Sequence, residues 1–418
     1  MEKKDNNSRG DLLNDLLENE NLTYNLPSAA TVVVEKNQKI FFCDKTKYNS
    51  GDDRIVITLN SGSDFIDGMN SYLSFNLKVT NPGTTTEVGF GDGSAANIFR
   101  EILIVSRDGA EIERVRDLNS LVATRCRWTK AKGYLDSTGT ASGYNSNTAA
   151  TTTALKGVGE DYTIPMRELS ALFDTDKLLP SFLMAGCRIE LALEKPEKAF
   201  VVVGDALTDY TVGRPTMRLE TLKLSDSVFN QLTQNAANGG LVIPINTWDL
   251  TPTTIESENA NVEVRRNVSQ VLGVLVKTRA KVDATPEGEV DSMAAEEKHD
   301  VLDYRFRLGS QFIPNTKVTS KVEHFTLANI AFNKFKRTDA ENSVSLAAFR
   351  DGGRGIIASD LERSAIDLSG VSISNSKVLA FEATYGAKPA GVTSRSINVW
   401  IQFTRALTVY LTNTLVED

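Results

Sequence analysis

The side chains best suited to catalysis are few in this sequence and are not spaced for it. The two histidines are His299 and His324, and neither belongs to an HExxH zinc motif. No serine lies in a GxSxG turn, the motif that exposes a nucleophile above a sheet. The glycine-rich segment GFGDGSAAN, residues 89–97, leads into strand-like residues, so we interpret it as a turn. The sequence therefore predicts no catalytic residue and no cofactor-binding residue.

Acidic side chains are numerous, but nothing singles out a catalytic or metal-binding group among them. Glycosidases on β scaffolds use two carboxylates, yet the aromatic fraction of 7% is low for a sugar-binding cleft. The segment VDATPEGEVDSMAAEEKHD, residues 282–300, carries seven acids, and oxygen-rich loops can bind Ca²⁺. It lacks the DxDxDG spacing, so we interpret it as a solvated charged loop and predict no metal site.

The three cysteines, Cys43, Cys126 and Cys187, are scattered along the chain and form no CxxC pair. We predict reduced, buried thiols without a zinc site. The N-terminal residues MEKKDNNSRGDLL contain no hydrophobic signal core, so we expect a protein that is not secreted through a signal peptide. No apolar run approaches the roughly 18 residues that a membrane helix needs. The formal net charge of −8 argues against wrapping nucleic acid by bulk charge.

Strict alternation of apolar and polar residues dominates the sequence from about residue 30. The clearest examples are residues 187–193, 304–308 and 397–411, and this period of two predicts half-buried β-strands. Only short helices are predicted, in residues 165–176 and 327–335. Polar stretches at residues 136–157, 282–300 and 350–370 are typical of long loops. The sequence therefore predicts an all-β protein with short helices in its loops.

The order of predicted elements repeats loosely, which predicts two β-sandwiches in succession. We expect an N-terminal arm at 1–26, a first sandwich at 27–220 and a second at 221–418. Within the arm, four leucines share one helical face: Leu12, Leu13, Leu16 and Leu17. These are the candidate interface residues, with a frayed terminus as the open alternative.

Four segments together resemble the double jelly-roll major capsid proteins of polinton-like viruses, adintoviruses and virophages. They are SYLSFNLKV, GSAANIFREILIVSRDGAEIERV, LLPSFLMAGCRIELALE and YRFRLGSQFIPNTKV, in this order along the chain. The resemblance implies two consecutive eight-stranded jelly rolls. It also implies a homotrimer that forms a pseudo-hexameric capsomer and tiles an icosahedral shell.

The same resemblance implies partners and a place of action. The partners would be further copies of the chain, penton proteins and minor capsid proteins, without direct sequence-specific binding of nucleic acid. The chain would lie in the virion capsid, and a contact of the arm with an inner membrane or the genome stays open. The alternatives are a minor capsid or spike protein, a two-domain carbohydrate-binding adhesin and an enzyme on a β-sandwich.

Overall fold

A computed structural model describes residues 32–418 except 52, 61, 81–86, 92, 145–158, 204–208, 282–299, 337–342, 352–353, 363–369 and 389–390. The predicted arm and its four leucines therefore lie outside the described residues. The same holds for most of the two loops predicted at 136–157 and 282–300.

The first half of the chain folds into two facing sheets. One sheet has the order β1-β11-β4-β8, and the other has the order β3-β9-β6-β7. The bounds of these strands are β1 Val33–Phe42, β3 Arg54–Thr58, β4 Phe65–Thr80, β6 Phe99–Val105, β7 Glu111–Arg116, β8 Glu160–Pro165, β9 Arg188–Leu193 and β11 Asp209–Leu224.

The second half repeats the arrangement with the sheets β12-β20-β14-β17 and β13-β19-β15-β16. Its strands are β12 Leu241–Ile255, β13 Asn259–Val264, β14 Val268–Lys281, β15 Val301–Leu308, β16 Gln311–Val318, β17 Ile357–Asp360, β19 Leu379–Tyr385 and β20 Ser394–Val409. Three short strands extend these sheets: β2 Lys47–Asn49, β18 Val371–Ile373 and β21 Thr414–Glu417. Two others pair with each other: β5 Glu87–Gly89 and β10 Val201–Val203.

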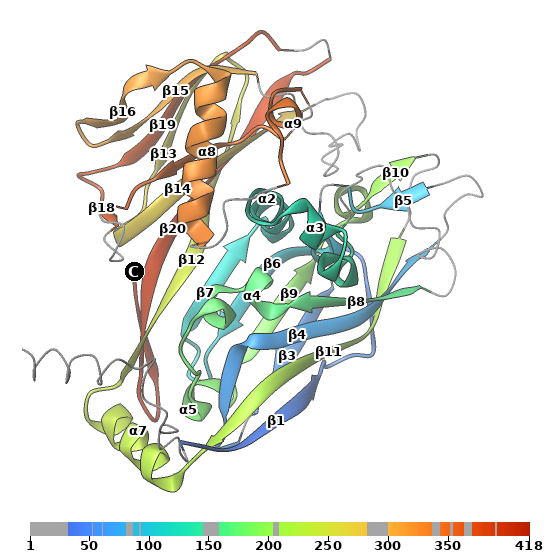
Figure 1. Cartoon of the computed structure of the whole chain (residues 1–418), viewed down its shortest axis with the longest axis vertical. Helices are drawn as coiled ribbons and strands as arrows, with labels where there is room; N and C mark the ends of the chain where they lie inside the picture. The colour runs from blue at the N-terminus through green and yellow to red at the C-terminus, as the bar shows by residue number, and fades with distance from the viewer. Residues whose placement is uncertain are drawn as a thin grey trace, which may run out of the picture.

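The two halves have the same topology. Numbered within each half, the strands run first-eighth-third-sixth in one sheet and second-seventh-fourth-fifth in the other. This is the strand order of a jelly roll, so the predicted fold class is confirmed: the chain is a double jelly roll (Figure 1). The domain boundary predicted between residues 220 and 221 falls inside β11, which continues to Leu224. Helix α7, Asp226–Asn238, then connects the two jelly rolls.

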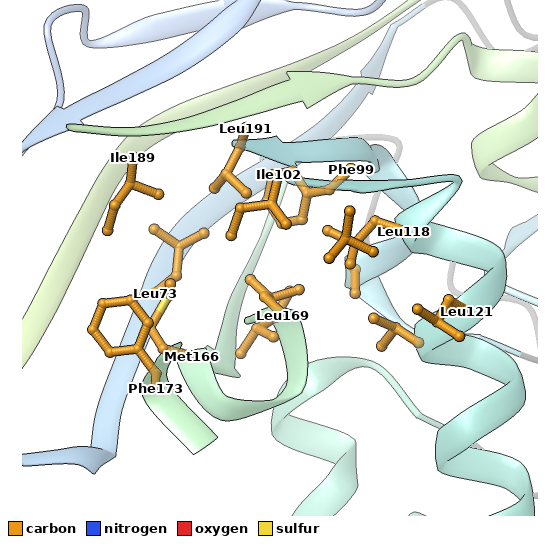
Figure 2. Close-up of a cluster of buried hydrophobic side chains, with 14 of the residues drawn as sticks. Leu73, Phe99, Ile102, Leu118, Leu121, Met166, Leu169, Phe173, Ile189 and Leu191 are labelled. Carbon is orange, nitrogen blue, oxygen red and sulfur yellow. The ribbon is translucent and has the colours of Figure 1, made fainter. Parts of the chain in front are cut away.

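The alternation of apolar and polar residues along the strands explains why the two sheets of a sandwich pack face to face. In β9, Ile189 and Leu191 point inward and are fully buried, whereas Arg188 is exposed. They meet Leu73 of β4 and Ile102 of β6 in the core between the sheets (Figure 2). The end of this core is covered by α2, Leu118–Thr129, by α4, Met166–Leu169, and by the 3₁₀ helix η5, Ala171–Asp174.

Helices lie between the fifth and sixth strands of each jelly roll. In the first half these are α2, α3 (Lys132–Leu135) and the 3₁₀ helix η3 (Thr138–Ser142). In the second half they are α8 (Lys321–Lys336) and α9 (Leu346–Asp351). The other short helices of the described residues are η2 Ala95–Ile98, α5 Ser181–Met184 and α6 Pro196–Ala199.

Two loop predictions were partly wrong. Residues 138–142 form η3, because Ser142 is buried and its hydroxyl donates to the carbonyl of Thr163 over 2.7 Å. Residues 357–360 form β17, because their backbone pairs with residues 273–276 of β14. In both places tertiary contacts stabilise a structure that the local polar composition does not predict.

Candidate functional site

The two histidines do not form a catalytic group. His299 lies outside the described residues. His324 of α8 is buried, its Nε2 lies 3.0 Å from the carbonyl oxygen of Val318, and its ring packs edge-on against Tyr304. The backbone contact and the aromatic contact account for His324 as part of the core.

His324 leads to a pH prediction. Burial lowers the pKa of His324 below its ordinary value of 6.5. The neutral ring is therefore favoured in the folded state, and this stability is present above pH 6.5 and lost as the pH falls through the folded pKa. We expect the free energy of unfolding to fall between pH 7 and pH 5. His324→Gln keeps a donor for Val318, and it should reduce that slope in denaturant titrations at several pH values. An unchanged slope would contradict the prediction.

The cysteines are unsuited to nucleophilic chemistry. Cys126 and Cys187 are buried, Cys43 is half-buried, and none forms a disulfide. Burial raises the pKa of each of the three thiols to about 12. The reactive thiolate is therefore scarce at neutral pH.

Over the described residues, no cluster of three or more His, Cys, Asp or Glu side chains could hold a metal ion. None of the described helices combines the length and the apolar character that crossing a bilayer takes. The other candidate sites are the exposed surfaces and the contact between the jelly rolls.

An aromatic cluster joins the two jelly rolls. Trp128, at the end of α2, stacks on Phe332 of α8 with ring centroids 5.4 Å apart. Phe325 of α8 and Phe349 of α9 pack against the same indole at 5.7 and 5.9 Å. The helices that contact each other hold equivalent places in the two halves. The apolar core of the first jelly roll continues into these residues, whereas the sheets of the second jelly roll enclose a separate core of their own.

A buried carboxyl group lies at a second contact between the jelly rolls, where β7 meets β12. Glu113 of β7 is fully buried and accepts hydrogen bonds from the backbone N–H groups of Ala171, at 3.0 Å, and Leu172, at 3.3 Å. It also accepts from the hydroxyl of Ser170, and from the hydroxyl of Thr247 in β12 at 2.8 Å. A buried acid needs such partners. Glu113 therefore connects β7, the start of η5 and the first strand of the second jelly roll.

Polar contacts extend along the same junction. Asp117 accepts a hydrogen bond from the side-chain amide of Asn398 at 2.6 Å, and Arg116 donates to the carbonyl of Leu250 at 3.0 Å. Further along, Arg405 donates to the carbonyl of Ile112 at 2.9 Å. In Figure 1, β12 and β20 continue past the second jelly roll toward α7, beside the first. These contacts hold the two jelly rolls side by side in a fixed orientation.

Strand β1 is the most exposed apolar element of the described surface. Phe42 is 74% exposed and Ile40 is 44% exposed, and they share the outer face of the strand, whereas Phe41 between them packs inward. Val32, Val33 and Val34 are also exposed at its start. Within the described residues β1 pairs only with β11, which leaves one edge of its backbone open. Exposed apolar edge strands commonly mark association sites.

Sequence reasoning did not find the junction residues or β1. Leu12, Leu13, Leu16 and Leu17 lie outside the described residues and stay a prediction. The run VVVEKNQKIFF did contain a signal, because three valines, an isoleucine and two phenylalanines surround a polar centre at the edge of the first sandwich.

Comparison with known proteins identifies the fold. Neither the protein-family models nor the curated protein sequences gave a match. Among solved structures, PBCV-1 VP54, fitted into a reconstruction of the virophage Sputnik, matches with a TM-score of 0.61 and 9% identity. That match covers 94% of this chain and 98% of VP54.

Two further structures are named as major capsid proteins. The Faustovirus protein matches with a TM-score of 0.57 and 8% identity, covering 93% of this chain and 92% of its own. The mavirus protein matches with a TM-score of 0.54 and 9% identity, covering 94% and 92%. The matches extend over both jelly rolls. The chain therefore has the double jelly-roll fold of viral major capsid proteins.

Proposed function

We propose that the chain is a major capsid protein, three copies of which form a pseudo-hexameric capsomer of an icosahedral shell. The observation that carries this proposal is the repeated jelly roll with its buried junction. Two similar units in a fixed orientation allow a ring of three chains to present six similar units. The likeness to the Faustovirus and mavirus proteins over nearly the whole chain supports the same function.

The experiment that tests this proposal is the absolute mass of the purified full chain by light scattering on a sizing column. The chain has a mass of 45.7 kDa, so three copies have a mass of about 137 kDa (3 × 45.7). We expect a trimer that survives dilution, or larger shells visible by electron microscopy. A monomer at high concentration would refute the proposal.

We further propose that β1 contributes to the contact between copies. The double substitution Ile40→Lys and Phe42→Lys places charge on its exposed apolar face, where a buried contact would not tolerate it. We expect the folded monomer to remain and the trimer to be lost in light scattering. Leu302→Lys, at a residue of β15 that is 53% exposed, is the matched control and should leave the trimer intact. A trimer that withstands the β1 substitutions would rule out this contact.

The N-terminal arm, residues 1–26, is proposed to dock through Leu12, Leu13, Leu16 and Leu17 on a neighbouring capsomer or a minor capsid protein. Deleting the arm should leave trimers intact but impair assembly into shells, because each lattice contact is weak and many must act together. Light scattering measures the first effect and electron microscopy the second. Normal shells from the truncated chain would contradict this role.

A further inference from the structure

A charged pocket of about 320 Å³ opens at the junction between the jelly rolls. Its walls come from β6, β7, the start of α2, the segment between β9 and α6, helix α6 itself, and β14. The lining residues are Arg100, Glu101, Arg116, Asp117, Asn119, Glu194, Lys195, Lys198 and Arg279. Nothing in the proposed shell function requires such a pocket.

Five cations face three acids in this pocket, within a chain whose net charge is −8. All three acids have partners within the protein, and Glu101 pairs with Arg114 at 3.5 Å and with Arg54 at 4.0 Å. The buried carboxyl group of Glu194 accepts from the backbone N–H of Lys195 at 2.9 Å and from the amide of Asn119 at 3.3 Å. Asp117 accepts from Asn398 and lies 4.0 Å from the guanidinium of Arg279. The cations of the lining outnumber the acids by two (5 − 3), so positive charge prevails in the pocket.

Several of the cations can reach a ligand. The side chains of Arg100 and Lys195 are exposed and make no hydrogen bond or ion pair with the described residues. Arg279 lies in the second jelly roll, is only 11% exposed, and reaches across to the hydroxyl of Ser120 in α2. The positive end of the α2 dipole adds to this field, since α2 starts at the pocket with Asp117 as its N-cap.

We propose that this pocket binds a small multivalent phosphate anion that bridges the two jelly rolls. Guanidinium groups match phosphate oxygens with paired hydrogen bonds, and lysine adds point charges. The volume corresponds to about ten water molecules at roughly 30 Å³ each, which is enough for a chain of three phosphates. Arg100, Lys195 and Lys198 would hold the anion from the first jelly roll, and Arg279 from the second.

Isothermal titration of the full-length chain with inorganic triphosphate tests the proposal. We expect saturable binding with one site per chain and a higher unfolding temperature, because the anion binds only the folded pocket. The variant Arg100→Gln/Lys195→Gln should weaken binding about tenfold or more, the factor expected for one charge-assisted hydrogen bond. Both residues are exposed, so the fold should be unaffected.

The variant Lys132→Gln/Lys223→Gln is the matched control, since it removes the same charge from exposed positions outside the pocket. It should bind triphosphate like the unmodified chain. Equal weakening in both variants, or no saturable binding at millimolar triphosphate, would overturn the proposal. So would binding of a single-stranded oligonucleotide without binding of triphosphate, because the basic surface would then be an open groove. The pocket lies within one chain, so these outcomes do not depend on whether the chain forms trimers.

Discussion

Replacing Trp128 with alanine is expected to lower the free energy of unfolding by about 3–5 kcal/mol, the usual cost of truncating a buried aromatic side chain. Trp128 is the residue on which Phe325, Phe332 and Phe349 converge, so its loss leaves a cavity between the jelly rolls. Denaturant unfolding followed by circular dichroism measures the effect.

The conservative variant Trp128→Phe keeps an aromatic ring and should lose less stability. In Trp128→Ala the two halves are also expected to unfold in separate steps, because the aromatic cluster that joins them is interrupted. A loss below about 1 kcal/mol in the alanine variant would mean that the aromatic cluster does not couple the halves.

Replacing Glu113 with alanine is the second change with a large expected effect. It removes the acceptor for the backbone N–H of Ala171 and for the hydroxyls of Ser170 and Thr247, whereas the N–H of Leu172 keeps the Ser170 hydroxyl as a second acceptor at 3.2 Å. Each buried donor left without a partner costs about 1–3 kcal/mol, so we expect a loss of about 3 kcal/mol or more. Denaturant unfolding measures this loss.

Glu111→Ala is the control for Glu113, because Glu111 lies on the same strand but is exposed. It should change the free energy of unfolding by less than about 0.5 kcal/mol. Thr247→Val removes only the hydrogen bond from the second jelly roll. Its loss in free energy of unfolding should lie between those of Glu113→Ala and Glu111→Ala. If Glu113→Ala were as mild as the control, the carboxyl group would not stabilise the junction.

The fold was predictable from the sequence where burial follows a strict period. β15 and the start of β9 alternate because one face of each packs on a core, whereas β20 alternates in sequence but is buried on both faces from Ile397 to Phe403. Helix α2 was missed because Leu118, Ser120, Val122 and Thr124 are all buried around its circumference, so no polar face marks the helical period. Helix α7 was missed although Val228, Phe229 and Leu232 lie at helical spacing among its polar Asn and Gln residues.

The junction could not be predicted because its partners are distant in sequence and ordinary in type. Glu113 and Thr247 are far apart in sequence, as are Trp128 and Phe332, so no local pattern predicts either contact. The segment EIERV has the pattern of an exposed strand and does not indicate that its second glutamate is buried. Such pairs are fixed only once two jelly rolls meet, which is a property of tertiary structure. The resemblance to capsid proteins identified the fold, but it did not identify these side chains.

The pairing of the first strand with the eighth has a consequence for synthesis on the ribosome. Phe42 of β1 pairs with Thr216 of β11, so β1 can form this pairing only after nearly the whole first half has been synthesised. Contacts this distant in sequence make folding slow, and unpaired strands are prone to aggregate meanwhile. Since β11 completes the first jelly roll before β12 emerges, each half can close in turn during translation. The nascent first half would then expose Trp128 until α8 is synthesised, which makes this interval the point at which a chaperone is most useful.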